Sequence, residues 1–305
     1  MQIAFAGTPH FGALVLGALL RSGHEVEAVL TQPDRPAGRG RRPSFSEVKE
    51  LAVREGLRVE QPEQASSAET VALLRSLGVR ALTIAAFGQI LKKPLLGAIP
   101  CINVHASLLP KYRGAAPIER AIMDGEGMTG VSIMEVEPKV DTGPVYLQKA
   151  VVIGKEDDAG VLYQKLGRTG GEALADVLDA MEERHIEPEP QDDGAATYAE
   201  KISKEDMRID WSEPAWKLAC RVRALSPHIG AFTMARGHRI KIWKAHVAEG
   251  SGKPGQVIIK DERLLVACGT GTLELMELQA EGKRGMAAPE FLRGYKKLLG
   301  KRLGS

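Results

Sequence analysis

Short apolar runs alternate with helix-like stretches through the first half of the chain. The runs occupy residues 3–6, 26–30, 81–87, 102–104 and 131–136. Runs of this kind, often β-branched, are typical of strands that are buried on both faces of a parallel sheet. Between them, apolar residues recur at helical spacing, as in the set Phe11, Leu14, Val15 and Leu19. The alternation predicts an α/β domain with a doubly wound, mostly parallel sheet, whose ligands bind at the carboxyl ends of the strands.

A polar, proline-containing segment interrupts this pattern at residues 185–196. Its prolines and acidic residues support neither helical nor strand periodicity, so it is typical of a linker. We therefore expect a first domain at residues 1–187, a linker at 188–207 and a second domain at 208–305.

The second domain begins with one helix pattern at residues 213–225. Five short strand candidates follow, separated by glycine and charged turns, at residues 232–234, 239–243, 256–259, 264–267 and 273–278. Several short strands with frequent turns predict a small OB-like β-barrel, a fold that often binds nucleic acids.

Composition places the chain among ordinary globular proteins. Its 305 residues are 44% hydrophobic and 26% charged, which excludes collagen-like, coiled-coil and wholly disordered classes. The apolar run at 81–87 is too short to cross a bilayer, and the chain opens on a strand pattern without signal-peptide features. We expect a cytoplasmic protein with no membrane partner.

Cys101, Cys220 and Cys268 are widely spaced and indicate buried thiols, so we expect neither disulfides nor a metal site.

The net charge of +2 conceals an asymmetry between the two parts of the chain. Residues 1–208 hold 24 Lys and Arg against 30 Asp and Glu, whereas residues 209–305 hold 17 against 9. The C-terminal part thus carries +8, which suits a polyanionic partner. Chance charging of a solvated surface explains the split equally well by itself. Together with a barrel, it favours contact with an RNA backbone.

Three residues have side chains suited to acyl transfer. Asn103 and His105 end a predicted strand two positions apart, so they share one face, and Asp141 follows in an Asp-Thr-Gly motif. An amide that holds an oxyanion, an imidazole that moves a proton and a carboxylate that orients the imidazole are what acyl transfer to an amine requires. A lone histidine at a strand end is more often structural, but the combination favours a catalytic site.

Familiar signatures of other chemistries are missing from the sequence. It contains neither the GxSxG elbow of covalent hydrolases nor the HExxH motif of zinc proteases. The glycine turn at residues 7–12 also lacks the spacing of a dinucleotide-binding loop or a P-loop. A direct attack by the amine, without a covalent enzyme intermediate, fits these absences.

A basic segment follows the second predicted strand. Arg35, Arg39, Arg41 and Arg42 lie among prolines and glycines, which prevent regular structure. The segment is either a solvated surface loop or an arm that contacts phosphates, and its four arginines beside one aspartate favour the arm.

Residues 101–122, CINVHASLLPKYRGAAPIERAI, with the later Asp-Thr-Gly, resemble the catalytic signature of the folate-dependent formyltransferases. These enzymes transfer formyl from 10-formyltetrahydrofolate. FAGTPHFG at 5–12, QPDRPAGRGRR at 32–42 and YAEKISKEDMRIDW at 198–211 are similar to the branch of the family that acts on initiator methionyl-tRNA. The resemblance covers essentially the whole chain.

The resemblance implies a Rossmann-like formyltransferase domain and assigns roles to residues of this sequence. It makes Asn103, His105 and Asp141 catalytic. It places folate at Phe87, Gly88, Gln89, Ile90, Leu91, Ser107, Leu108, Leu109 and Pro110. It assigns tRNA contacts to Arg35, Arg39, Arg41 and Arg42.

The implied function is therefore formylation of initiator methionyl-tRNA for translation initiation, with 10-formyltetrahydrofolate as co-substrate and no metal. We expect a monomer. Two alternatives stay open at this point: a formyltransferase that acts on a small amine such as a ribonucleotide or an amino sugar, and an RNA-binding protein with an inactive α/β domain. The first explains the catalytic residues but not the basic C-terminal part; the intact Asn103, His105 and Asp141 argue against the second.

Overall fold

The structure is a computed structural model, which describes residues 1–37 and 42–304. The chain forms two compact units, and neither is continuous in sequence. The first comprises Met1–Gly114, Met128–Val152 and Tyr163–Ala199, and the second Ala115–Gly127, Ile153–Leu162 and Glu200–Ser305. The chain enters the second unit for the last time after Ala199, which lies inside the segment expected as a linker. The expected division at residues 188–207 stays a prediction.

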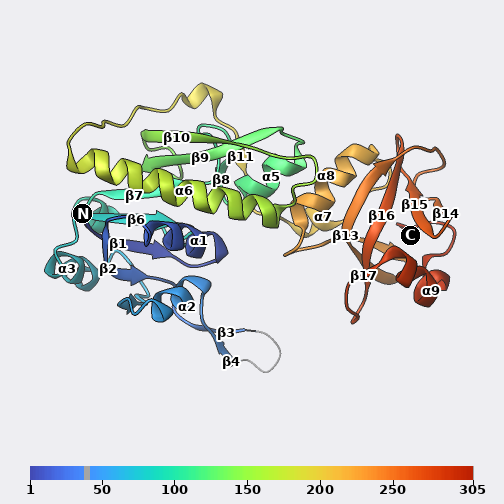
Figure 1. The fold of residues 1–305 in the computed structure, drawn as a ribbon, viewed down its shortest axis with the longest axis horizontal. Helices are drawn as coiled ribbons and strands as arrows, with labels where there is room; N and C mark the ends of the chain where they lie inside the picture. The colour runs from blue at the N-terminus through green and yellow to red at the C-terminus, as the bar shows by residue number, and fades with distance from the viewer. Residues whose placement is uncertain (38–41, 305) are drawn as a thin grey trace. The chain divides into compact units, whose positions relative to one another are not determined.

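A seven-stranded sheet forms the centre of the first unit (Figure 1). Its strand order is β10-β9-β7-β6-β1-β2-β5. Five neighbouring strands are parallel: β1 (Gln2–Gly7), β2 (Glu25–Leu30), β5 (Val59–Glu60), β6 (Ala81–Ala85) and β7 (Cys101–His105). This arrangement confirms the predicted mostly parallel α/β sheet.

Two strands at one edge of the sheet run the other way. β9 (Met128–Glu135) is antiparallel to β7, and β10 (Val145–Val152) is antiparallel to β9. The interpretation of residues 131–136 as a buried parallel strand was therefore wrong in direction. β10 exposes alternate residues along part of its length, which an antiparallel edge strand tolerates because only one of its faces needs to be buried.

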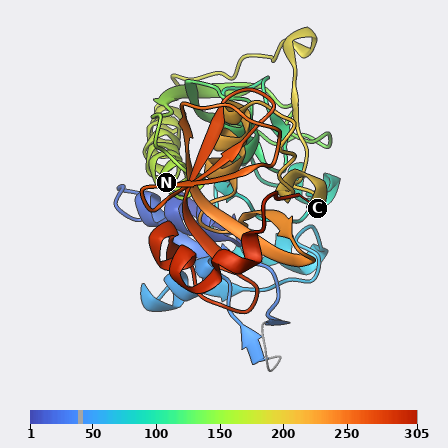
Figure 2. The same cartoon turned by 90° about the vertical axis from the view of Figure 1, so that its right-hand side faces the viewer.

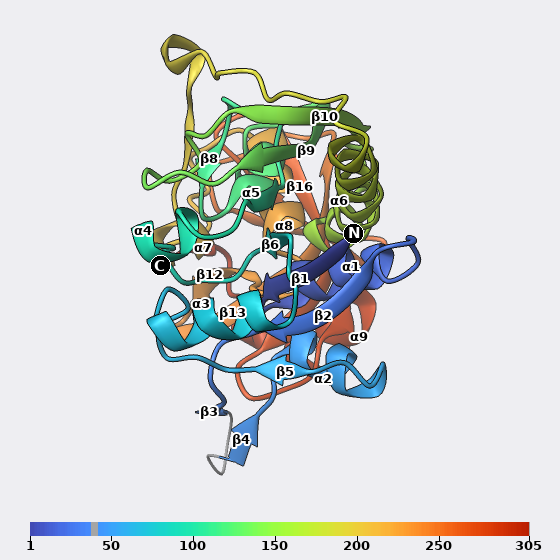
Figure 3. The same ribbon diagram turned by 90° about the vertical axis from the view of Figure 1, so that its left-hand side faces the viewer.

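Helices cover both faces of this sheet (Figure 3). On one side lie α1 (His10–Leu19), α2 (Glu47–Arg54) and α6 (Ala159–Glu182); on the other lie α3 (Ala68–Ser76) and α4 (Lys93–Leu96). Ser46 caps α2 and Ser67 caps α3, since each hydroxyl accepts a hydrogen bond from a backbone N–H in the first turn.

Close packing of α6 on α1 depends on a glycine. A Cβ atom added at Gly171 would lie 2.3 Å from Cβ of Ala18 and 2.8 Å from the carbonyl oxygen of Val15, so no larger residue fits. Both helices bury apolar side chains, among them Val15 and Leu19 of α1 and Leu174 and Val177 of α6.

Two small pairs of strands complete the first unit. β3 (Arg35–Ala37) and β4 (Arg42–Ser44) form an antiparallel hairpin after β2. The expectation that prolines and glycines prevent regular structure here was wrong for these residues, because a two-stranded pair has only edge strands, which tolerate proline. β8 (Arg113–Gly114) pairs in parallel with β11 (Tyr198–Ala199), which follows the short 3-10 helix Asp193–Ala195. Residues just before β11, expected as linker, are thus bound to the first unit.

The second unit contains an antiparallel sheet (Figures 1 and 2). Its strands pair in the order β12 (Ala231–Ala235), β13 (His238–Ala248), β16 (Thr272–Ala280), β15 (Arg263–Ala267) and β14 (Val257–Lys260), with β17 (Met286–Ala287) beside β16. The expected β-domain is confirmed as antiparallel, and each predicted strand matches one observed strand. Closure into an OB-like barrel stays a prediction.

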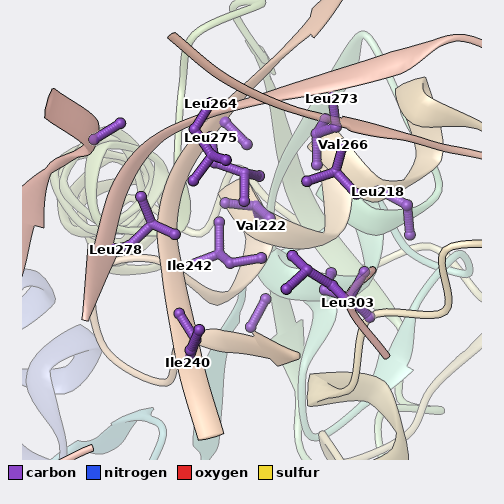
Figure 4. Close-up of a cluster of buried hydrophobic side chains, with 14 of the residues drawn as sticks. Leu218, Val222, Ile240, Ile242, Leu264, Val266, Leu273, Leu275, Leu278 and Leu303 are labelled. Atoms are coloured by element: carbon purple, nitrogen blue, oxygen red, sulfur yellow. The ribbon is translucent and has the colours of Figure 1, made fainter. Parts of the chain in front are cut away.

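The helices of the second unit are α5 (Pro117–Met123), α7 (Lys204–Met207), α8 (Ala215–Leu225) and α9 (Ala288–Leu299). Figure 4 shows how α8 and the strands share one core. Val222 of α8 lies close to Ile242 of β13 and Leu275 of β16, and Leu218 of the same helix belongs to the same buried cluster. The predicted helix at 213–225 corresponds to α8, whereas α9, drawn in red in Figure 2, was not predicted.

None of the helices within the described residues combines the length and hydropathy needed to cross a membrane. Cys101, Cys220 and Cys268 are buried free thiols, as expected. Burial, reinforced by the carboxylate of Glu135, raises the pKa of the Cys101 thiol to about 12.

Candidate active site

Asn103 and His105 lie at the carboxyl end of β7, near the middle of the sheet. They face the same side of the strand because one residue separates them. The side chain of His105 is 6% exposed, whereas Asn103 is half-buried. Within the described residues, no hydrogen bond engages the side-chain amide of Asn103. That amide is therefore free to bind a ligand.

The ring of His105 is held between two oxygen acceptors. Nε2 lies 2.9 Å from the carbonyl oxygen of Tyr112, and Nδ1 lies 3.6 Å from Oδ2 of Asp141. Because a carbonyl oxygen only accepts, Nε2 carries the proton of the first contact, and Nδ1 faces the carboxylate beyond direct hydrogen-bond distance. The structure thus brings together the three residues predicted to be catalytic, and in this conformation Asn103 has the uncommitted donor.

Asp141 reaches the histidine from the loop between β9 and β10. Its φ of 54° is left-handed, and its Oδ2 accepts a hydrogen bond of 2.8 Å from the backbone N–H of Gly114. Gly143 is required in the same loop, since a Cβ there would lie 2.0 Å from the carbonyl oxygen of Glu135. These contacts explain physically why glycine completes the Asp-Thr-Gly motif.

The first predicted folate segment follows β6, the strand next to β7. Phe87 and Leu91 are buried in the core, and the side-chain amide of Gln89 accepts from Ala65 N and donates to Pro62 O. Gly88, with a φ of 83°, and Ile90 are exposed. Of this predicted set, Gly88 and Ile90 present the most accessible surface to a ligand.

The second predicted folate segment follows β7. Ser107 is fully buried, and its hydroxyl donates to Lys111 O at 2.6 Å. Leu109 is buried as well, whereas Leu108 and Pro110 are half-buried. The structure therefore directs Ser107 and Leu109 into the protein, where they shape the loop, and leaves Leu108 and Pro110 partly accessible.

Two polar residues that sequence reasoning missed hold this loop in place. The hydroxyl of Ser132 donates to Ser107 O and accepts from Leu109 N, and the amide of Gln148 donates to Leu109 O. Ser132 is a polar residue inside the apolar run 131–136, which was the one signal that could have identified it.

Two of the four predicted tRNA-contacting arginines lie in the described strands of the β3–β4 hairpin. Arg35 is exposed at its start, and Arg42 lies in β4; Arg39 and Arg41 fall outside the described residues. Lys49 anchors the base of the hairpin.

Lys49 contacts chain segments on both sides of the hairpin. Its Nζ lies 2.5 Å from Oδ2 of Asp34, which precedes β3, and 4.0 Å from the ring centre of Phe45, which follows β4. The hydrogen bond from Lys49, followed by one from Gln61, lowers the pKa of Asp34 below its ordinary value. The base of the hairpin is therefore fixed just beyond the carboxyl end of β2.

No group of three or more His, Cys, Asp or Glu side chains within the described residues is arranged to hold a metal ion.

Comparison with known proteins identifies the class. Residues 1–178 match the family model described as formyl transferase, and residues 201–296 match the model of the formyl transferase C-terminal domain. The chain is therefore a member of the formyl transferases, and its fold agrees with that class. The "Methionyl-tRNA formyltransferase" of Solibacter usitatus is 44% identical over 308 residues, covering 100% of this chain and 99% of that relative.

Solved structures show the same fold. HypX from Aquifex aeolicus in complex with tetrahydrofolic acid matches 96% of this chain and 48% of its own, with a TM-score of 0.66 and 19% identity. Methionyl-tRNA formyltransferase from Clostridium thermocellum matches 81% of this chain and 94% of its own, with a TM-score of 0.55 and 16% identity. By its full-length relatives and both family models, the chain belongs to the methionyl-tRNA formyltransferase family.

Proposed function

We propose that this protein transfers the formyl group of 10-formyltetrahydrofolate to the amino group of methionine on initiator methionyl-tRNA. The observation that carries the proposal is the meeting of Asn103, His105 and Asp141 at the carboxyl edge of the sheet. The full-length similarity to relatives named methionyl-tRNA formyltransferase supports methionyl-tRNA as the acceptor.

The reaction begins when the amine attacks the formyl carbon. Negative charge then develops on the formyl oxygen, and the free amide N–H of Asn103 donates a hydrogen bond to it. The bond between the formyl carbon and N10 breaks, N10 takes up a proton, and tetrahydrofolate leaves. The attacking amine loses a proton, which the pair of His105 and Asp141 helps to move.

The geometry of His105 favours a role in proton movement over a direct bond to the oxyanion. Its Nε2 donates to Tyr112 O, so that N–H binds the formyl oxygen only by giving up this bond, while Nδ1 faces the carboxylate of Asp141. Asn103 is then the donor that stabilises the oxyanion, and the His105–Asp141 pair exchanges the proton of the amine.

Folate binds, in this proposal, along the exposed parts of the loops after β6 and β7. Gly88, Ile90, Leu108 and Pro110 offer accessible backbone and side-chain surface at neighbouring strand ends. The other members of the predicted set support the shape of those loops: Phe87, Leu91, Ser107 and Leu109 are buried, and the half-buried Gln89 bonds to the backbone of Pro62 and Ala65.

The tRNA binds through two basic regions. One is the arginine hairpin, and the other is the C-terminal part of the chain with its charge of +8. On α9, Arg293, Lys296 and Lys297 are exposed, whereas Phe291, Leu292 and Leu299 of the same helix are buried. Exposed cations of this kind contact phosphates without reading sequence. We propose a monomer that acts in the cytoplasm and needs no metal.

The test compares acceptors with purified full-length protein and 10-formyltetrahydrofolate. Release of tetrahydrofolate should require initiator tRNA charged with methionine, while uncharged tRNA, glycinamide ribonucleotide and an amino-sugar nucleotide should give no turnover above background. Turnover with a small amine and none with charged tRNA would assign the protein to the small-amine formyltransferases. RNA binding without any turnover would indicate an inactive α/β domain.

A further inference from the structure

The side-chain amide of Gln191 closes the loop that carries Asp141. Its Nε2 donates to the carbonyl oxygen of Asp141 at 2.9 Å and to that of Gly143 at 2.7 Å. The two carbonyls flank Thr142, so one NH2 group fixes the loop on both sides of that residue. Gln191 belongs to residues 189–199, which are bound to the first unit by pairing with Val145 and with β8.

Arg113 fixes the direction in which the Gln191 amide points. Its Nε and Nη2 donate to Oε1 of Gln191 at 3.1 and 2.9 Å. A guanidinium has donors only, so Oε1 must face it and the NH2 group must face the two carbonyls. Arg113 is 3% exposed, and the carboxylate of Asp193, 2.8 Å from Nη2, offsets its charge.

The conformation of Asp141 needs this support. A φ of 54° is uncommon for a residue with a side chain, although aspartate adopts it more readily than most, so contacts that hold it stabilise the loop. The position of the Asp141 carboxylate depends on this backbone conformation. In it, Oδ2 lies 2.8 Å from Gly114 N and 3.6 Å from His105 Nδ1. Arg113 and Gly114 are consecutive in β8, so one short strand holds the carboxylate and the Gln191 amide together.

We propose that Gln191 is a positioning residue for formyl transfer, which holds Asp141 in the left-handed conformation that directs its carboxylate to His105, and that Arg113 orients Gln191 for this task. The inference rests on the proposed function, because it takes Asp141 as part of the proton-transfer pair. Gln191 itself contacts only the loop backbone and Arg113.

Two variants test whether Gln191 positions Asp141 or only helps to bind residues 189–199 to the first unit. Gln191→Glu keeps the size of the side chain and its acceptor for Arg113, but it sets an oxygen against the two carbonyls. Gln191→Leu removes donors and acceptor together. We expect both to lower kcat on the order of 10- to 100-fold, since small displacements of a catalytic group cost that much, with KM for tRNA and for the folate within about two-fold. The matched control is Asp192→Asn, beside Gln191 in the sequence: Asp192 is exposed, and asparagine keeps the oxygen that accepts from Gly194 N, so kcat should stay within about two-fold of wild type.

A second substitution at Asp141 tests whether Gln191 acts through it. In an Asp141→Asn background, adding Gln191→Leu should lower kcat less than two-fold further, because the residue being positioned has already lost its charge. A loss in the double variant equal to the product of the single losses would overturn the proposal, and so would wild-type kcat in Gln191→Glu and Gln191→Leu.

Hydrogen exchange separates failure of this inference from failure of the proposed function. The Gly114 amide, bonded to the Asp141 carboxylate, should exchange faster in Gln191→Leu than in wild type, whatever the acceptor of the enzyme is. Unchanged exchange would overturn the inference even in an active enzyme. A wild-type protein that transfers no formyl group would defeat the proposed function, and with it the role of Gln191 in that reaction.

Discussion

Replacing Asp206 by asparagine removes one partner of a largely enclosed ion pair in the second unit. Arg120 donates from Nη1 to Oδ1 at 2.9 Å and from Nη2 to Oδ2 at 2.8 Å. The two side chains are 21% and 23% exposed. The hydrogen bond from Arg120 is the main cause that lowers the pKa of Asp206 from 3.8 to about 2, and the capping contacts of Ser203 add to it.

The shift in pKa sets the size of the expected effect. One pKa unit corresponds to about 1.4 kcal/mol, so the charged form of Asp206 contributes about 2 kcal/mol to the free energy of unfolding at pH 7. Because the folded pKa is depressed, this contribution is present above pH 3.8 and disappears as the pH falls through about 2. Roughly half of it remains near pH 3.

Urea unfolding, followed by circular dichroism, measures this contribution. Asp206→Asn should lower the free energy of unfolding by about 2 kcal/mol at pH 7 and by about half as much near pH 3. The control is Glu290→Gln, since Glu290 and its partner Arg284 are 45% and 81% exposed; it should change stability by less than about 0.5 kcal/mol. Equal effects of the two substitutions, or an Asp206→Asn effect as large at pH 3 as at pH 7, would refute the reasoning.

Two further predictions concern the substrates. Asn103→Ala should lower kcat roughly 100- to 1,000-fold by removing one oxyanion donor, with an unchanged melting temperature because the amide makes no hydrogen bond within the described residues; normal kcat in the folded variant would exclude the role. Replacing Arg35 and Arg42 together by alanine should weaken tRNA binding and flatten its salt dependence by ~0.7 to 0.9 per lost phosphate contact, while folate affinity stays the same; equal loss of both affinities would show that the hairpin supports the active site itself.

The sequence predicted the parts of the fold that local patterns determine. Four of the five parallel strands, β1, β2, β6 and β7, overlap the predicted apolar runs, whereas the two-residue strand β5 (Val59–Glu60) was not predicted. Asn103 and His105 stand at the end of β7, so strand periodicity placed both residues on one face at the carboxyl edge of the sheet. The direction of β9 was predicted wrongly because the apolar pattern of a buried strand does not depend on whether it pairs parallel or antiparallel. The helix α9 was not predicted, because the segment was interpreted only by its basic residues. The helical spacing of Phe291, Leu292 and Leu299 was the signal for it.

The contacts that shape the site could not be read from composition. Residues 188–199 look like a linker, since prolines and acidic residues occur both in free segments and in segments bound to a surface. What binds this segment is long-range: Gln191 contacts Asp141, 50 positions earlier in the chain. In the same way, the serine of the signature was expected to contact folate, yet the structure turns the Ser107 hydroxyl inward to Lys111 O.

A single-turnover experiment with formyl-labelled 10-formyltetrahydrofolate tests the central claim most directly. Enzyme in excess is mixed with initiator methionyl-tRNA, and the label is followed with wild type and with Asp141→Asn. We predict that the label appears on the methionine amino group in the wild type, and that the rate falls at least about 100-fold in the folded Asp141→Asn variant. Label released as formate, label left on the folate, or an unchanged rate in Asp141→Asn would contradict formyl transfer to methionyl-tRNA by the Asn103, His105 and Asp141 site.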